Sequence, residues 1–121
     1  MLRASRVSIK RARLFTAYCL DVNERTKWSL YVVRTRDGQL YTGVATDVPR
    51  RLDEHRAENG RGAKYLRGRG PLTLAYEIAV GPRELALRVE SRLKRRPREE
   101  KERVVAMAPP LAKLLTLLEL E

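Results

Sequence analysis

Two short segments near the middle of the chain are rich in β-branched and aromatic residues. They span residues 28–35 and 39–45, and Arg36-Asp37-Gly38 lies between them. Such segments favour extended strands, and a polar tripeptide with a glycine is typical of a tight turn. The pattern therefore predicts a β-hairpin. A third apolar segment, residues 72–80, predicts a third strand.

Helical spacing of apolar residues and helix-boundary signals occupy most of the remaining chain. Helices are predicted over residues 46–57, 81–96, 98–108 and 111–120. Asp47 can cap the first of these, and Pro49 is tolerated in its first turn. Pro97 ends the second helix, because proline cannot continue one. The last helix is so apolar that it must pack on the domain or on a partner.

The length of the hairpin turn decides which way Tyr31 and Tyr41 point. A two-residue turn would place them on opposite faces, because strand side chains alternate. A three-residue turn, with Gly38 in the left-handed conformation, pairs Tyr31 with Gly43 and places both phenols on one face. We adopt this second register. Gly43 carries no side chain, so we expect open space in front of the Tyr31 ring.

Length and charge limit the classes of protein. A chain of 121 residues accommodates one domain with a modest core. Lys and Arg total 26, against 15 Asp and Glu, and 20 of the 26 are arginine. Arginine binds phosphate through a planar fork of donors, so a nucleic-acid partner is the leading explanation for the net charge of +11. The composition bias of a GC-rich genome is the alternative.

The distribution of charge suggests a division of the chain. We predict a basic N-terminal extension (residues 1–27), a central domain (28–107) and an apolar C-terminal helix (108–121). No apolar segment approaches the roughly twenty residues of a membrane span, so no membrane partner is expected. The lone Cys19 allows no intramolecular disulfide, and we predict a cytoplasmic protein. Residues 1–20 lack acids and contain several arginines, so an organellar presequence is the alternative.

Three side chains outside the hairpin are candidates for chemistry. Arg51 and His55 are four residues apart, so they share one helix face and reach toward the same point. A surface histidine without a role is the alternative for His55. Glu90 borders an apolar stripe, where a carboxylate needs a cation or a donor. Either a salt bridge to an arginine or a divalent metal would serve, and the helix alone favours the salt bridge.

A glycine-rich basic loop, residues 58–71, follows the first helix. It holds four of the seven glycines, and such a segment can bring backbone amides and cations close to phosphates. A flexible linker is the alternative. Tyr65 within it could stack on an unpaired base. The candidate cations for nucleic-acid binding are Arg50, Arg61, Lys64, Arg67 and Arg69.

The order and spacing of these groups resemble the GIY-YIG nuclease superfamily. The residues that carry the resemblance are Tyr31, Tyr41-Thr42-Gly43, Arg51, His55 and Glu90. The chain is most similar to small, single-domain bacterial members of the YhbQ type, whose sequences share the segments 40–43, 46–48, 62–64, 70–74 and 85–88. Ser29, Leu30 and Thr42 depart from the motif, but none of these changes removes a catalytic group.

The resemblance implies an α+β fold, in which a small three-stranded antiparallel sheet is flanked by helices. It also implies hydrolysis of phosphodiester bonds with one divalent metal, Mg²⁺ or Mn²⁺. Glu90 would be the metal ligand, Arg51 would steady the scissile phosphate, and His55 would assist proton transfer. One of the tyrosines would help to activate the attacking water, and the resemblance does not choose between Tyr31 and Tyr41.

We expect the substrate to be DNA in structured, damaged or single-stranded form, with RNA as the alternative. Two other functions remain open. The chain would be a nucleic-acid-binding module with little turnover if the same basic surface only holds phosphates. It would be a partner-activated nuclease subunit if the Leu111–Leu120 segment docks on another protein or on a second copy.

Overall fold

The computed structural model describes residues 27–57 and 62–120. Most of the predicted N-terminal extension (1–27), the presequence-like residues 1–20 and the candidate cation Arg61 lie outside the described residues. Within the part that is described, no helix is long and apolar enough to cross a membrane.

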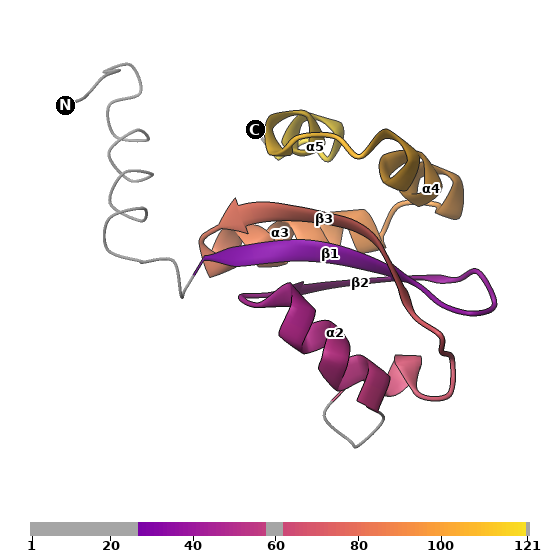
Figure 1. The fold of residues 1–121 in the computed structure, drawn as a ribbon. Helices are drawn as coiled ribbons and strands as arrows, with labels where there is room; N and C mark the ends of the chain where they lie inside the picture. Colours follow the sequence, from indigo (N-terminus) through magenta and orange to yellow (C-terminus); the bar gives the residue numbers. More distant parts are fainter. Residues whose placement is uncertain (1–26, 58–61, 121) are drawn as a thin grey trace, which may run out of the picture.

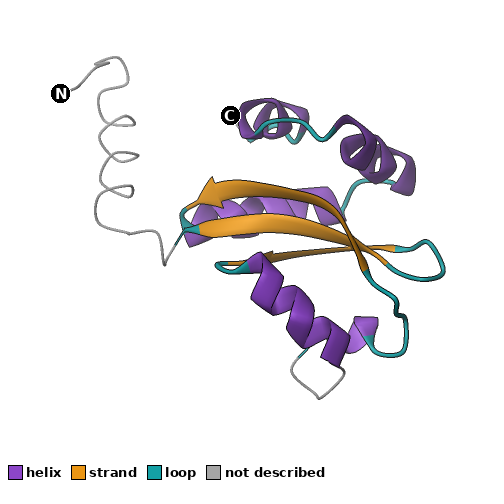
Figure 2. Ribbon diagram, viewed as in Figure 1, coloured by secondary structure: helices purple, strands orange, loops and turns teal. Residues whose placement is uncertain are grey.

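The centre of the fold is a three-stranded antiparallel sheet (Figures 1 and 2). Its strands are β1 (Trp28–Arg34), β2 (Leu40–Ala45) and β3 (Thr73–Gly81). The spatial order is β2-β1-β3, so β1 is the central strand and pairs with both others. The predicted α+β architecture with a three-stranded antiparallel sheet is confirmed. The third strand begins and ends one residue later than predicted.

The hairpin has the three-residue turn that places both tyrosines on one face. Thr35 N–H donates to the Gln39 carbonyl at 2.9 Å, and Gly38 N–H donates to the Thr35 carbonyl at 3.0 Å. Gly38 has φ of +85°, which glycine adopts without strain. Tyr31 is consequently opposite Gly43, as the register predicts.

Helices surround the sheet (Figure 2). They are α2 (Val48–Ala57), the 3₁₀-helix η2 (Lys64–Leu66), α3 (Arg83–Lys94), α4 (Arg98–Met107) and α5 (Leu111–Leu117). The Asp47 carboxylate accepts a hydrogen bond from the Arg50 N–H at 3.1 Å, so it caps α2 as predicted. The last helix is shorter than predicted, and Glu119 just beyond it has φ of +60°, outside the helical region.

Side chains of β1 alternate between two apolar clusters on opposite faces of the sheet. Leu30 and Val32 pack with residues of α3, α4 and α5. Tyr31 and Val33 pack with residues of α2 and η2. Figure 1 shows α2 on one side of the sheet and α4 and α5 on the other. The central strand is therefore covered on both faces, and Tyr31 belongs to the α2 side.

The terminal helix α5 contributes to the core of this chain. Leu114 is 0 % exposed and Leu118 just beyond the helix is 2 % exposed, and both pack in the cluster that contains Leu30. The Tyr76 hydroxyl donates to the Pro109 carbonyl at 2.6 Å and holds the connection between α4 and α5 against β3. Docking of the Leu111–Leu120 segment on a partner stays a prediction.

The described part of the glycine-rich loop is attached to the hairpin. Arg36 N–H donates to the Arg69 carbonyl at 2.9 Å, and the Arg36 guanidinium donates to the Gly70 carbonyl at 3.1 Å. Leu66 of η2 is 1 % exposed. Residues 62–71 therefore do not form the flexible linker that was the alternative for this segment.

Candidate active site

Tyr31 is seated against the backbone of the neighbouring strand. Its side chain is 2 % exposed, and its ring lies over Gly43. A Cβ atom added at Gly43 would be 2.5 Å from the Tyr31 hydroxyl oxygen and 2.6 Å from Cζ. The expectation of open space in front of the ring is therefore wrong, because the ring itself fills the space that the glycine leaves.

His55 of α2 meets the Tyr31 hydroxyl. The His55 Nε2 atom is 2.8 Å from the Tyr31 oxygen. On the other side of the ring, Nδ1 accepts a hydrogen bond from the Ala63 backbone N–H at 2.9 Å. A nitrogen that accepts carries no proton, so in the neutral imidazole the proton is on Nε2 and is donated to Tyr31.

The environment of His55 favours this neutral form. Burial lowers the pKa of His55 below its usual value, and the charge of Arg51 lowers it further, while Glu54 acts in the opposite direction. The side chain is 2 % exposed, so the alternative of a surface histidine is wrong.

Gly62 allows the loop to approach His55 closely enough for the Ala63 hydrogen bond. A Cβ atom at this position would be 2.6 Å from His55 Cα and 2.9 Å from the Glu54 carbonyl oxygen. Both of these are backbone atoms, which cannot move aside as the end of a flexible side chain can. Gly62 is thus a residue that sequence reasoning missed, because a single sequence carries no signal of such a contact.

Arg51 approaches the same phenol from α2. Burial first, and then the nearby Tyr41, raise the pKa of Tyr31, which reaches about 12. A hydrogen bond from Arg51 and the charge of Arg51 lower the pKa of Tyr31, and Glu90 raises it slightly. Arg51 and His55 therefore reach one point, as their spacing predicts, and that point is the Tyr31 oxygen.

Tyr41 lies beside this pair and connects it to the loop. Its ring centroid is 6.5 Å from that of Tyr31 and 5.7 Å from that of His55. The Tyr65 ring stacks on Tyr41 with an interplanar angle of 18°, and the Arg69 guanidinium lies 4.3 Å from the Tyr65 centroid. Tyr65 already stacks within the chain, so its availability to an unpaired base is lower than the sequence suggests.

Glu90 reaches the cluster from α3. Its carboxylate lies 3.2 Å from the Lys94 ammonium, and its side chain is 18 % exposed. Lys94 also lies 5.9 Å from the Tyr41 ring centroid, which places the ion pair next to the tyrosines. The predicted salt bridge is present, but its partner is a lysine one turn further along α3, not an arginine. The four-residue spacing was a signal for this pair.

Glu90 contributes one carboxylate to the cluster, and Lys94 is its ion-pair partner. Among the described residues, no three side chains of His, Cys, Asp or Glu gather into a metal-binding group. Mg²⁺ nevertheless needs only one or two protein carboxylates when water and substrate phosphate oxygens complete its shell. Glu90 fits such a site, provided that the cation displaces Lys94.

The candidate phosphate-binding cations differ in their surroundings. Lys64 and Arg67 are exposed. Arg69 forms an ion pair with Asp37 at 3.3 Å, and the exposed Arg50 lies 3.6 Å from Glu54. Among the described candidate cations, Lys64 and Arg67 are therefore the two that are exposed and form no ion pair.

Comparison with known proteins identifies the class. Residues 27–103 match the GIY-YIG catalytic domain family, and the chain belongs to this family. It is 52 % identical over 94 residues to the UPF0213 protein YhbQ of Escherichia coli O157:H7 (strain EC4115 / EHEC), an alignment that covers 78 % of this chain and 92 % of that protein. The UPF0213 protein YhbQ of Shigella boydii serotype 18 is 51 % identical with the same coverage.

A solved structure is also similar to this chain. It is the solution NMR structure of the UPF0213 protein BH0048 from Bacillus halodurans, which is 41 % identical and has a TM-score of 0.45. The match covers 67 % of this chain and 84 % of that one. The family match over residues 27–103 and the 52 % identity to YhbQ confirm the resemblance to YhbQ-like GIY-YIG proteins. Family membership supports an endonuclease-like role and nucleic-acid binding.

Proposed function

We propose that this protein is a divalent-metal-dependent endonuclease that hydrolyses phosphodiester bonds in DNA, with Tyr31 as the general base. The observation that carries the proposal is the arrangement at the Tyr31 hydroxyl, where His55 Nε2–H donates at 2.8 Å and Arg51 adds a second donor. Two donors on one phenol oxygen stabilise its anionic form, which is the form that accepts a proton.

The other residues of the cluster complete the reaction. The Tyr31 oxygen takes the proton of the attacking water as the new P–O bond forms, and the bond to the leaving oxygen breaks. Arg51 binds the scissile phosphate, and its planar fork suits two phosphate oxygens. Glu90 would hold Mg²⁺ or Mn²⁺, and that ion would polarise the phosphoryl oxygen and offset charge at the leaving oxygen.

Burial works against this base. A phenol with a pKa of about 12 is almost entirely protonated near neutral pH, so His55 and Arg51 must act together with the positive field of the bound cation. The phenol therefore acts as a base only together with these donors. Tyr41 receives no hydrogen bond from His55 and is assigned a packing role beside Tyr31.

The substrate and location are further parts of the proposal. Lys64 and Arg67 are exposed on and beside η2, where they would contact phosphates that flank the scissile one. We propose structured, damaged or single-stranded DNA as the substrate, RNA as the alternative, and the cytoplasm as the compartment. We also propose that the chain consists of an extension (1–27), a nuclease-like domain (28–107) and a terminal segment (108–121).

Cleavage assays with matched variants test the proposal. Supercoiled, single-stranded and branched DNA, and single-stranded RNA, would be incubated with the protein in the presence of Mg²⁺ or Mn²⁺. We expect metal-dependent cutting by the wild type and none by Glu90→Gln. Glu84→Gln is the control, because Glu84 is exposed in the first turn of the same helix. Thermal melting of each variant shows whether the fold is retained.

The same assay separates the two tyrosines. Tyr31→Phe removes the proposed base, so its rate should fall by about 10²–10⁴-fold. Tyr41→Phe keeps the ring in the stack and should reduce the rate much less. Metal-dependent cutting that survives Glu90→Gln would contradict the proposal. Tight, salt-sensitive binding by a wild type that never cuts would favour the binding module instead.

A further inference from the structure

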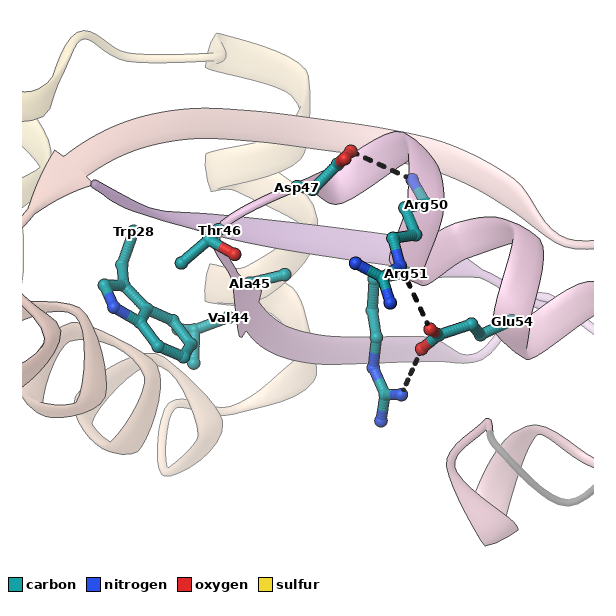
Figure 3. Close-up of a pocket in the computed structure, with 8 residues that line it drawn as sticks. All are labelled: Trp28, Val44, Ala45, Thr46, Asp47, Arg50, Arg51 and Glu54. Carbon is teal, nitrogen blue, oxygen red and sulfur yellow. Dashed lines mark hydrogen bonds and ion pairs between the residues drawn. The ribbon is translucent and has the colours of Figure 1, made fainter. Parts of the chain in front are cut away.

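A pocket lies next to the proposed catalytic residues and shares only Arg51 with them. It has a volume of about 330 Å³ and opens where β2 passes into α2 (Figure 3). Trp28 and Val44 form one side of it. Arg50, Arg51 and Glu54, from the first turns of α2, form the other side.

The charged groups of the pocket neutralise one another. Arg51 Nη1 lies 2.8 Å from one oxygen of the Glu54 carboxylate, and Arg50 Nε lies 3.6 Å from the other. The second carboxylate, Asp47, caps the backbone N–H of Arg50 at 3.1 Å. On the proposed function Arg51 faces the scissile phosphate, and Arg50 beside Asp47 and Glu54 leaves no net positive field to attract a second phosphate into the pocket. The chemistry of its walls suits an uncharged ligand that is flat enough to lie on an aromatic ring.

Trp28 is the surface on which such a ligand would lie. The side chain is partly exposed and packs against the apolar cluster that contains Leu30. The Arg83 guanidinium, which is not part of the pocket wall, lies 5.5 Å from the Trp28 ring centroid and supports the ring. An indole offers a flat stacking surface, which binds every nucleobase through its π face.

Arg51 connects the pocket to the catalytic residues. Arg51 lines the pocket, and its side chain hydrogen-bonds to Tyr31. A ligand in the pocket therefore lies next to any second group that Arg51 binds near the Tyr31 hydroxyl. On the proposed function, Arg51 holds the scissile phosphate, and in a nucleic acid the base of the adjoining nucleotide lies one sugar away from that phosphate.

We propose that this pocket binds the unpaired nucleobase next to the scissile phosphate, by stacking it on Trp28. The inference rests on the proposed function and narrows its substrate to single-stranded or extruded nucleotides. The volume of about 330 Å³ is at the lower end of the range of about 300–1,000 Å³ for small-molecule pockets, and it is large enough for a nucleobase. A base within a duplex is covered by its neighbours and must leave the stack to enter.

The fluorescence of Trp28 tests this assignment directly, because Trp28 is the single tryptophan of the chain. The full-length wild type would be titrated in EDTA, which prevents cutting, with an end-labelled single-stranded DNA octamer. The anisotropy of the label reports binding, and tryptophan emission reports contact with Trp28. The matched probes are an octamer of abasic sugar-phosphates and a duplex of the same length.

We expect the single-stranded octamer to quench Trp28 in step with the rise in anisotropy. The abasic octamer should bind through its phosphates about 5- to 150-fold more weakly without quenching, the equivalent of ~1–3 kcal/mol of stacking. The duplex should also bind without quenching. Thr46→Phe, at an exposed position on the pocket rim, should fill the pocket and weaken binding of the octamer to the level of the abasic probe.

Two results would overturn the inference in distinguishable ways. Equal quenching by the abasic octamer or the duplex, or binding of the octamer without quenching, removes the base pocket and leaves the phosphate site intact. No change in anisotropy with any probe removes the proposed function together with the pocket. Trp28→Phe keeps an aromatic ring on which a base can stack, so this variant should retain most of the affinity. It tests stacking without the risk of unfolding that a smaller side chain at position 28 would carry.

Discussion

Gly43 and Gly62 allow Tyr31 and His55 to take their positions because these glycines have no side chain. Their backbone dihedral angles play no part in this. Gly43 admits the Tyr31 ring, and Gly62 admits the backbone of α2 at His55. Neither has a positive φ among the described glycines, unlike Gly38 in the hairpin turn. An alanine at either position would therefore be strained by contact with its neighbours, not by its own dihedral angles.

The first prediction at this scale concerns the tautomer of His55. Gly62→Ala should push the loop away from α2 and break the Ala63 hydrogen bond to Nδ1. His55 is the single histidine of the chain, so ring ¹⁵N NMR gives one unambiguous pair of signals. We expect a pure Nε2–H form in the wild type, a mixture in Gly62→Ala, and a loss of about 1–3 kcal/mol of stability from overpacking.

Gly70→Ala is the matched control, because the nearest atom to its added Cβ would be 3.9 Å away. This variant should keep the tautomer of the wild type. An unchanged Nε2–H form in Gly62→Ala would show that the loop does not select the tautomer, whatever the variant does to cleavage.

The second prediction concerns the pH dependence of stability. The pKa of His55 is lowered in the folded protein, mainly by burial, so the unfolded state binds the proton more tightly. The contribution of His55 is complete above the ordinary value of 6.5 and is lost as the pH falls through the lower, folded value. Urea unfolding of the wild type and of His55→Gln between pH 8 and pH 5 measures it. The stability difference between the two should shrink as the pH falls, and a constant difference would refute the assignment.

At the scale of elements, α5 is an apolar helix whose packing partner the sequence left open. Its leucines predicted burial, and in the structure they pack against β3, α3 and the core side chains of β1. Leu114 is 0 % exposed, whereas Leu117 on the same helix is 41 % exposed. The helix is therefore part of the fold and contributes to the stability of the sheet that carries Tyr31.

This difference gives the third prediction. Leu114→Ala should lower the free energy of unfolding by about 2–5 kcal/mol, because it leaves a cavity in the core. Leu117→Ala, the control on the same helix, should change it by less than about 0.5 kcal/mol. Denaturant unfolding measures both. If the two substitutions cost the same, α5 would not pack as described, and docking on a partner would become the better explanation of its leucines.

At the scale of the whole molecule, the effect of the net charge of +11 on nucleic-acid binding depends on where the cations lie on the surface. The proposed phosphate contacts lie on one side of the sheet, at α2 and η2. The arginines of α4 lie on the other side, and Arg98 donates to the Gly38 carbonyl at 2.9 Å. Binding should accordingly depend on a few cations and not on the total.

Salt dependence tests this placement. For single-stranded DNA, each phosphate contact contributes about −0.7 to the slope of log K against log salt concentration. Lys64→Ala and Arg67→Ala should each make the slope shallower by roughly this amount. Arg103→Ala, at an exposed position of α4, is the control and should leave the slope unchanged. Equal effects of all three would indicate binding by overall charge alone.

The sequence was most informative where structure depends on near neighbours. The turn at Gly38 follows from residues within the hairpin, and it alone decides that Tyr31 is opposite Gly43. The start of α2 follows from the Asp47 cap. The common helix face of Arg51 and His55 follows from the helical period. These interactions join residues a few positions apart, so little beyond the local sequence affects them.

Only the tertiary structure decided what those local elements meet. The His55–Tyr31 hydrogen bond spans 24 positions, and the contacts of Gly62 and the pocket beside Trp28 join segments that are separated by turns and loops. Each depends on how β1, α2 and η2 pack, which no periodicity encodes. The sequence by itself determined the hairpin register, the approximate positions of α2 to α5 and the family of the chain, but not the 3₁₀-helix η2. Packing determined the tautomer of His55, the burial of Tyr31 and the neighbours of Arg51, because side-chain contacts between distant segments form only when the whole core is assembled.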